Sequence, residues 1–336
     1  MMTHANMGDR GAKRRWLNLL SSLIVGLGLM APALASAQDF PSKPVTVIVP
    51  HAAGSQPDTI MRLLQPKLQD ALGQLVTVEA HSGAAATIGT LSVVRAEPDG
   101  HTILFATGSP ITRNPFMQKD YPFDPLTDLE PISRTSETYA ILVAPVDAPF
   151  DTVEELISYA REHPGELTYS SAGIGSAGHV VGEMLNTEAG IDIVHVPYGG
   201  GSEIVNAVLG GHVSMTFAGA PVAMPHVEDG TLKVIASADR KRVPDLPDVP
   251  AINEIVPGVE VTSWHAFYAP AGTPENVIDI LSNAVRAALE DSEVEGRLDS
   301  MGVTVVASTP QELRQWGEEE YHKLEAVIAG MGIEPQ

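Results

Sequence analysis

The chain has 336 residues, no cysteine, and a formal net charge of −22 from 42 acidic and 20 basic residues. Without cysteine there can be no disulfide bond, thiolate metal site or cysteine nucleophile, so packing must hold the fold. The negative charge argues against nucleic acid or an anionic membrane surface as partner, because both would be repelled.

The first 37 residues have the pattern of a secretory signal peptide. A basic stretch over 10–15 precedes an apolar run over 17–34, and the small residues at 35–37 form an A-x-A cleavage pattern. We expect export and a mature chain that begins at Gln38. No later run approaches the roughly 18 continuous apolar residues that a membrane-spanning helix needs.

The next part of the chain alternates predicted strands and helices. Short β-rich runs at 45–49, 76–79 and 103–106 predict strands. Apolar residues at helical spacing predict a helix from Thr59 to Leu72, closed by Gly73, with a kink or break at Pro66.

The same alternation continues to the end of the chain and indicates an α/β architecture with largely parallel sheets. The helix after Thr152 has a capping-box pattern, with Glu155 three residues further on. The remaining predicted strands are 140–144, 167–170, 193–196, 213–217 and 233–237. Of the remaining predicted helices, one begins near 180, another ends at 209, and two long ones span 277–291 and 310–330.

Four loops that follow predicted strands are rich in small and hydroxyl residues: 51–58, 107–110, 171–179 and 198–202. In open α/β sheets, ligands bind beyond the carboxyl ends of the strands. The stretch from Ser170 to His179 holds three glycines, three serines and a histidine, and it leads into a helix. Such a turn offers backbone N–H groups to an anion. Alternatively, the small residues only make a tight turn, and the stretch alone does not separate the two interpretations.

Catalysis is not favoured by these motifs. Ser171 or Ser176 with His179 could suggest a nucleophile and a base, but the G-x-S-x-G spacing is absent. The phosphate-loop and H-E-x-x-H patterns are also absent. We expect no enzymatic activity, no metal and no cofactor, and we expect His195, Trp264 and Tyr268 to have structural roles.

The chain resembles the periplasmic solute-binding proteins of tripartite tricarboxylate transporters, the Bug receptors. The resemblance covers nearly all of the sequence after the signal peptide. The matching stretches are 41–44 and 48–50, 53–54 with 58, 83 with 88–89, 98–100, 114–115, 121–125, 170–179 with 182–183, 195–198, 209–211, 225–226, 246–250 and 269–274.

The resemblance implies a type II-like periplasmic-binding-protein fold with a ligand cleft between two domains joined by two crossing segments. Domain 1 would comprise 38–142 and 262–336, and domain 2 would comprise 143–261. A ligand carboxylate would be held by backbone N–H groups and hydroxyls of the first loop and the 170–179 loop. Carried over to this chain, the ligand-binding residues would be His51, Ala53, Gly54, Ser55, Gln56, Thr87, Thr107, Ser171, Gly175, Ser176, Ala177, His179, Tyr198, Gly199 and Ala218.

Departures from the family pattern bear on the ligand. Gly199 stands where the family often has lysine, and Ala218 stands where amino-acid-binding members have an aspartate for the amino group. We therefore expect a small organic acid without an amine, such as an aromatic or dicarboxylic acid. The resemblance implies a periplasmic monomer that delivers this ligand to membrane permease subunits. A periplasmic sensor for a signalling system is the alternative, and a secreted hydrolase is less favoured.

Overall fold

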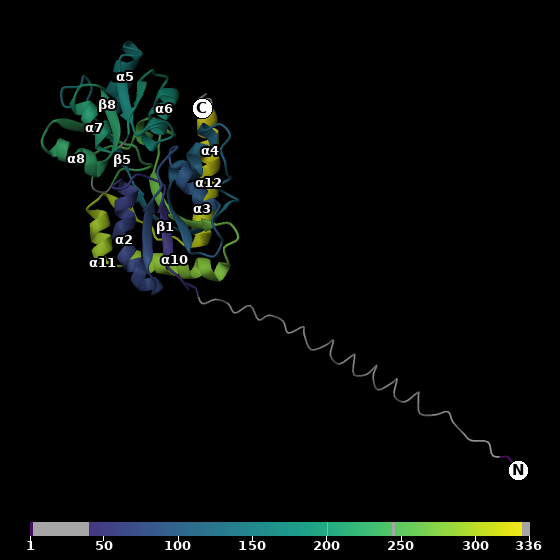
Figure 1. The fold of residues 1–336 in the computed structure, drawn as a ribbon. Helices are drawn as coiled ribbons and strands as arrows, with labels where there is room; N and C mark the ends of the chain where they lie inside the picture. The colour runs from purple at the N-terminus through teal and green to yellow at the C-terminus, as the bar shows by residue number, and fades with distance from the viewer. Residues whose placement is uncertain (3–39, 200, 244–245, 331–336) are drawn as a thin grey trace. The chain divides into compact units, whose positions relative to one another are not determined.

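The computed structural model describes residues 1–2, 40–199, 201–243 and 246–330 (Figure 1). Residues 40–336 form one compact unit. Apart from its first two residues, the predicted signal peptide lies outside the described residues. None of the helices that the structure describes is both long and apolar enough to span a membrane.

The eleven strands in the described residues form two sheets, as the alternation of strands and helices predicts. The first sheet has the order β11 (Val303–Val305), β4 (Leu129–Thr138), β10 (Ser263–Pro270), β3 (Thr102–Thr107), β1 (Val45–Val49) and β2 (Val76–Ala80). The second has the order β7 (Val194–Pro197), β6 (Thr168–Ser171), β8 (Met215–Gly219), β5 (Ala140–Pro145) and β9 (Leu232–Ser237).

Both sheets are mixed, so the expectation of largely parallel sheets is wrong. Strands β1, β2 and β3 run parallel, as do β6, β7 and β8, whereas β10 is antiparallel to β3 and β4, and β5 is antiparallel to β8 and β9. The reason is the path of the chain. β5 and β10 each begin directly after a crossing between the sheets. Each therefore enters its sheet beside the carboxyl ends of the parallel strands and runs back in the opposite direction.

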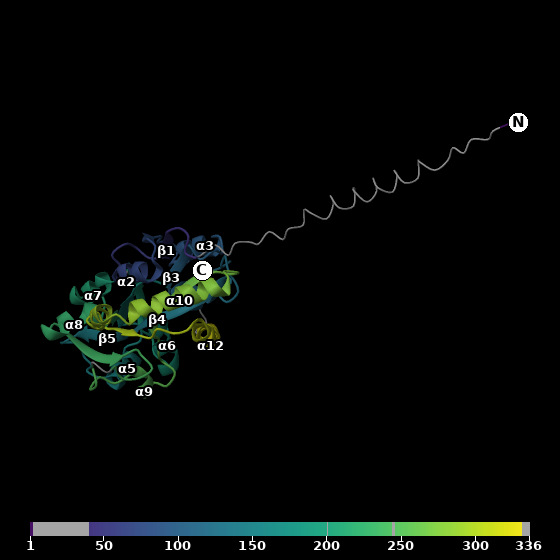
Figure 2. The same ribbon diagram turned by 90° about the horizontal axis from the view of Figure 1, so that it is seen from below.

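Helices cover both faces of each sheet, and the layers can be followed from below in Figure 2. On the first sheet, α2 (Gln56–Leu72), α10 (Glu275–Leu289) and α11 (Ser292–Asp299) pack on one face and α3 (Thr87–Val94) on the other. On the second, α5 (Val153–Glu162), α6 (Ala177–Ala189) and α9 (Ile252–Ile255) lie opposite α7 (Ser202–Leu209) and α8 (Ala220–Glu228).

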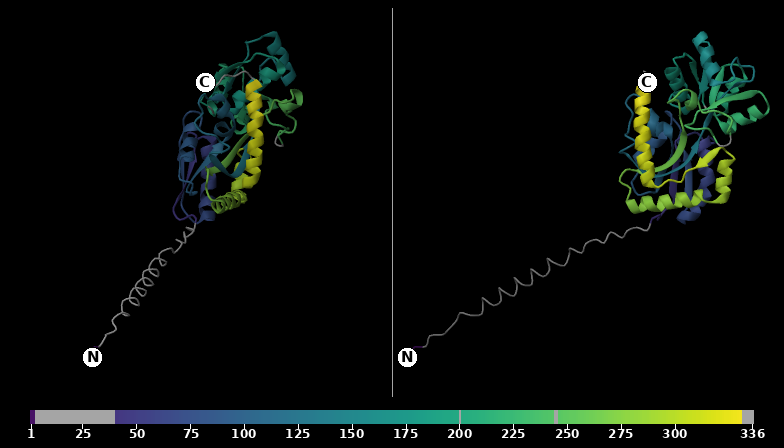
Figure 3. Two further views of the ribbon diagram at one scale, coloured as in Figure 1. Left: turned by 90° about the vertical axis from the view of Figure 1, so that its right-hand side faces the viewer. Right: turned by 180° about the vertical axis from the view of Figure 1, so that it is seen from behind.

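Helix α12 (Pro310–Gly330) packs against both halves of the molecule (Figure 3). Leu313 belongs to the core of the first sheet, whereas Leu324 and Ile328 belong to the core of the second. The helix therefore links the two sheets in addition to the crossing segments. The predicted domain boundary at 142–143 falls inside β5, and the boundary at 261–262 falls just before β10; the division into two domains at these positions stays a prediction.

Local signals in the sequence explain several helix ends. Helix α2 is continuous through Pro66, so the predicted break is absent and the predicted kink stays a prediction. Pro66 is exposed, so water can reach the carbonyl that loses its N–H partner. Gly73 ends the helix, as predicted, and it does so in the left-handed conformation, with φ 64°. Thr152 Oγ1 accepts from Glu155 N at 3.2 Å, while the Glu155 carboxylate accepts from Asp151 N, one residue before the position expected in a capping box.

Candidate functional site

A cavity of about 520 Å³ lies between the two sheets. Its wall comes from the segments that follow β1, β3, β6, β7 and β8, and from the crossing segments around Tyr139 and Trp264. The carboxyl ends of parallel strands from both sheets face this space, which is where ligands bind in open α/β sheets. The size is typical of a site for a small molecule.

The first turns of α2, α6 and α8 lie at this cavity. Ser55 caps α2 without a side-chain hydrogen bond, and its buried Oγ has no partner in the described residues. Ser176 caps α6 and its Oγ accepts from His179 N at 3.4 Å, which leaves the hydroxyl proton free to be donated. Because first-turn N–H groups have no partner within their helix, Ala177 and Gly178 offer donors at the positive end of the α6 dipole.

Several of the loop N–H groups expected to hold an anion have partners within the protein. Gly54 N donates to Asp58 Oδ2 at 2.8 Å, and Gly175 N donates to His179 Nδ1 at 3.3 Å. Ser176 N donates to the carbonyl of Gly173 at 3.1 Å. The donors that this cavity offers are therefore the hydroxyls and the first turns of the helices, and the glycines serve to make the turns.

Arg113 is a buried cation at the cavity that sequence analysis did not single out. It lies in the short π-helix η1 (Ser109–Arg113), and its side chain is 4% exposed. Its Nε donates to the carbonyl of Gly175 at 2.9 Å and its Nη2 donates to Ser109 Oγ at 3.0 Å. Burial lowers the pKa of Arg113 to about 10, against a weaker opposing effect of Glu320, so the guanidinium stays charged at neutral pH.

Two histidines also border the cavity. His51 Nε2 and Thr107 Oγ1 are 3.0 Å apart, and His265 stacks on Phe105 with its Nδ1 3.2 Å from Ser136 Oγ. Burial lowers the pKa of His51 to about 4, with a further contribution from Arg113, and lowers the pKa of His265 to about 3. Both rings are neutral at pH 7 and serve as hydrogen-bonding groups.

We expect the protein to lose stability between pH 6.5 and pH 4. Burial lowers the pKa values of His51, His179 and His195 to about 4 and that of His265 to about 3, from 6.5. In this range these histidines bind protons in the unfolded chain but not in the folded chain. Their contribution to the free energy of unfolding is therefore fully present above pH 6.5 and declines as the pH falls. Urea unfolding at pH 7.5 and pH 5.0 measures the difference. The difference in unfolding free energy between the two pH values should shrink in His265→Gln and stay unchanged in the exposed-site control His163→Gln. An equal difference in the wild-type chain and both variants would contradict this role of the buried His265.

The structure places part of the predicted ligand-binding set at the cavity. The predicted residues that line it are His51, Gly54, Ser55, Gln56, Thr107, Ser176, Ala177 and Gly199. The predicted residues that do not line it are Ala53, Thr87, Ser171, Gly175, His179, Tyr198 and Ala218.

Several of the predicted residues outside the cavity wall have partners within the protein, and their contact with a ligand stays a prediction. Thr87 is buried and its Oγ1 bonds to Gln118 and Asn114. Ser171 is fully buried, with its Oγ 2.6 Å from His195 Nε2, and the ring of His179 packs on His195. The contacts among Ser171, His179 and His195 support the 170–179 loop on the side away from the cavity.

The alternation along β8 turns Ala218 away from the cavity. Its neighbours Phe217 and Gly219 line the wall, whereas Ala218 and Tyr198 pack in the apolar cluster beneath α7. The expected absence of an amine-binding aspartate therefore cannot rest on position 218. Trp264 was expected in the core, and it is 1% exposed, but it also lines the cavity.

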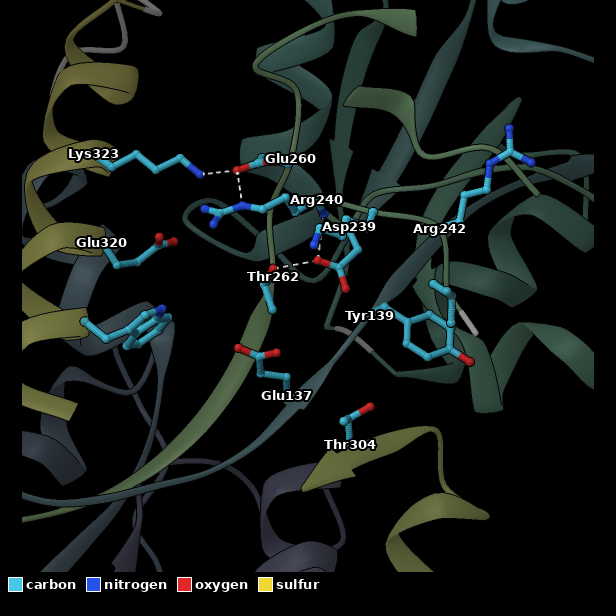
Figure 4. A pocket seen from close by; sticks show the side chains of 13 residues that line it. Glu137, Tyr139, Asp239, Arg240, Arg242, Glu260, Thr262, Thr304, Glu320 and Lys323 are labelled. Carbon is cyan, nitrogen blue, oxygen red and sulfur yellow. Dashed lines mark hydrogen bonds and ion pairs between the residues drawn. The ribbon is translucent and has the colours of Figure 1, made fainter. Parts of the chain in front are cut away.

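A second, smaller pocket of about 260 Å³ lies where α12 meets the crossing segments (Figure 4). Glu260 Oε1 accepts from Lys323 Nζ at 2.6 Å and from Arg240 Nε at 3.1 Å. Burial raises the pKa of Glu260, but these two cations outweigh it, so the net shift is downward. Thr262 donates to Asp239 at 2.8 Å. These groups pair with one another, so this pocket ties α12 to the second crossing segment and offers less to a ligand.

Two α/β layers that are joined by crossing strands and enclose a cavity define the class of periplasmic solute-binding proteins. Residues 60–333 match the model of the Tripartite tricarboxylate transporter family receptor. The chain belongs to this family.

Relatives and solved structures agree with this assignment. Protein BugT of Bordetella pertussis is 30% identical over 320 residues, which cover 95% of this chain and 98% of BugT. The structure of periplasmic binding protein BugD is 32% identical with a TM-score of 0.78, covering 88% of this chain and all of that one. Rpa4515 of R. palustris with adipate is 31% identical with a TM-score of 0.80 (89% and 100% covered), and MatC of Rhodopseudomonas palustris with bound malate is 31% identical with a TM-score of 0.77 (86% and 100% covered).

Proposed function

We propose that the chain is a periplasmic receptor that captures a small organic carboxylate without an amine, for delivery to the membrane permease subunits of a tripartite transporter. One observation carries this proposal. The chain holds 42 acidic residues, yet none of the described residues that line the cavity is acidic, and Arg113 lies among them. In so acidic a protein, a cavity wall without carboxylates and with one buried cation is suited to an anion.

The ligand carboxylate would be held by the first turns of α2 and α6, by Ser55 and Ser176, and by Arg113. Its carbon skeleton would contact Phe217 and other apolar groups of the wall. An ammonium group would find no carboxylate partner on the described wall, and a buried unpaired charge is costly. Solved relatives carry adipate and malate, both carboxylates without an amine.

Binding would favour closure of the two halves. A ligand that contacts α2 from the first sheet and α6 from the second gains interactions only when both are near it, so it shifts the population toward the closed form. A closed form with a changed outer surface is what a permease could recognise. We further propose export through the signal peptide at 1–37 and action as a monomer.

A hydrolase ranks below the periplasmic sensor as an alternative, and the site geometry does not favour it. The Ser171 Oγ to His195 Nε2 distance of 2.6 Å resembles a nucleophile and its base. However, Ser171 is fully buried and does not line the cavity, so a substrate carbonyl in the cavity has no path to its Oγ.

The proposal is tested by thermal-shift measurements with succinate, adipate, malate, benzoate, aspartate and glutamate. We expect at least one acid without an amine to raise the melting temperature, because a ligand that binds only the folded chain stabilises it. Aspartate and glutamate should have little effect. Tight binding of either amino acid, or no response to any acid, would contradict the proposal.

Removing either capping hydroxyl should weaken binding of the responding acid. Ser55→Ala and Ser176→Ala each remove one hydrogen bond to a charged group, so we expect each to cost about 1.5–3 kcal/mol of binding free energy. Isothermal titration calorimetry measures the loss. Ser158→Ala, on the exposed side of α5, is the control, and an affinity unchanged in both cavity variants would place the carboxylate elsewhere.

A further inference from the structure

Arg113 has donor capacity that the protein does not use. Its Nε and Nη2 are bonded to Gly175 and Ser109, and its Nη1 has no hydrogen-bond partner among the described residues. No acidic side chain of the described residues lies within ion-pair distance of the guanidinium, although its charge persists at neutral pH. A buried charge without a counter-ion is costly, so its presence at a cavity indicates an external partner.

Trp264 supplies an independent observation that points to the same place. Its side chain is 1% exposed, and its Nε1–H is buried without any acceptor among the described residues. A buried indole N–H normally finds a hydrogen-bond partner. Like Arg113, this residue lines the cavity.

Gly108 shows that the two unused donors converge. A Cβ placed on Gly108 would lie 2.8 Å from Arg113 Nη1 and 2.9 Å from Trp264 Nε1. Both donors therefore border the same small space beside the Gly108 backbone, and Gly108 also lines the cavity. The φ of Gly108 is −63°, which any residue can adopt, so glycine is needed here for space and not for backbone conformation.

We propose that Arg113 and Trp264 form an anion subsite beside Gly108, which takes a carboxylate of the ligand through direct hydrogen bonds from Nη1 and Nε1. This assignment rests on the proposed carboxylate-binding function and names Arg113 as the residue that binds the charged group of the ligand. The hydrogen bonds are charge-assisted on the arginine side, so this subsite is the strongest single anchor in the cavity.

The same guanidinium joins the two halves of the molecule. Its Nε holds the carbonyl of Gly175, in the loop before α6, while Arg113 itself belongs to the layer of the first sheet. A ligand carboxylate on Nη1 fixes the guanidinium from the other side. Arg113 therefore connects occupancy of the subsite to the position of the α6 loop.

The test compares matched pairs of variants in calorimetric titrations. The probe is whichever of sodium succinate, adipate, malate or benzoate gives the largest thermal shift with the wild-type chain. Arg113→Gln should bind it about 100-fold more weakly and Trp264→Phe about 5- to 10-fold more weakly. The controls are Arg314→Gln and Tyr159→Phe, which alter an arginine and an aromatic residue outside the cavity wall and should stay within twofold.

The results can refute the subsite without refuting the receptor function. If the probe binds Arg113→Gln within threefold of the wild-type affinity, the subsite is refuted while the receptor function stands. If Arg113→Gln does not fold, a wild-type affinity in Trp264→Phe refutes the subsite. If none of the four salts binds the wild-type chain, the carboxylate-binding function fails and the subsite fails with it.

Discussion

Ser109→Asp should strongly weaken binding of the responding carboxylate while leaving the fold intact. Ser109 Oγ accepts from Arg113 Nη2 at 3.0 Å, so an aspartate at this position places a carboxylate against the guanidinium. The internal carboxylate would neutralise the cation and repel the ligand. We expect a loss of about 3 kcal/mol of binding free energy, or roughly 100-fold in affinity.

The fold should tolerate this change because an acidic residue is favourable in the first turn of a helix and would give Arg113 the partner it lacks. Ser109→Asn is the matched control, since it has nearly the same shape and no charge. Calorimetry on the two variants isolates the charge effect. Equal affinities in Ser109→Asp and Ser109→Asn would contradict a direct electrostatic role for Arg113.

Gly182→Ala should be the most destabilising single-methyl change in α6. Gly182 packs directly on the ring of Tyr169, and the added Cβ would lie 2.7 Å from the Tyr169 hydroxyl and nearer still to two ring carbons. The ring cannot move away freely, because it is 1% exposed and its hydroxyl donates to Glu183 Oε1 at 2.7 Å. Overpacking of this kind costs about 1–3 kcal/mol, and we expect the upper part of that range.

Urea unfolding measures this loss, and the chain offers a matched control. Gly296 lies inside α11 with nothing within 4 Å of an added Cβ, so Gly296→Ala should stabilise the protein by about 0.5–1 kcal/mol. Because Tyr169 also supports the 170–179 loop through the carbonyl of His179, Gly182→Ala should weaken ligand binding as well. A Gly182→Ala protein as stable as Gly296→Ala would show that α6 can shift away from β6.

Sequence patterns predicted the elements whose signals are local. Strand β1, helices α5 and α10, and the αL cap at Gly73 all follow from short-range periodicity or from one special residue. β4 and β10 were not predicted. β4 carries Ser133, Thr135 and Ser136 in buried positions, so it lacks an apolar run, and its place in the sheet is set by pairing with β10, more than a hundred residues away.

The candidate site divides in the same way. The loops rich in small residues predicted the place of the cavity, because strand-to-helix turns mark the carboxyl ends of strands. Arg113 could not be recognised, since the residues that define its role, Gly175 and Trp264, are distant in sequence and meet it only in the fold. Ala218 was expected at the cavity, where amino-acid-binding members have an aspartate. Side chains alternate along β8, so a shift of one position moves a side chain from the cavity wall to the cluster that holds Ala218.

We propose that the cavity holds the carboxylate of a small acid between Arg113 and the first turn of α6. A crystal structure of the chain with the best-binding acid of the panel tests this arrangement. We expect a carboxylate within hydrogen-bond distance of Arg113 Nη1 and Trp264 Nε1, with the rest of the ligand against Phe217. A ligand seated in another pocket, or in this cavity with its carboxylate away from Arg113, would contradict it.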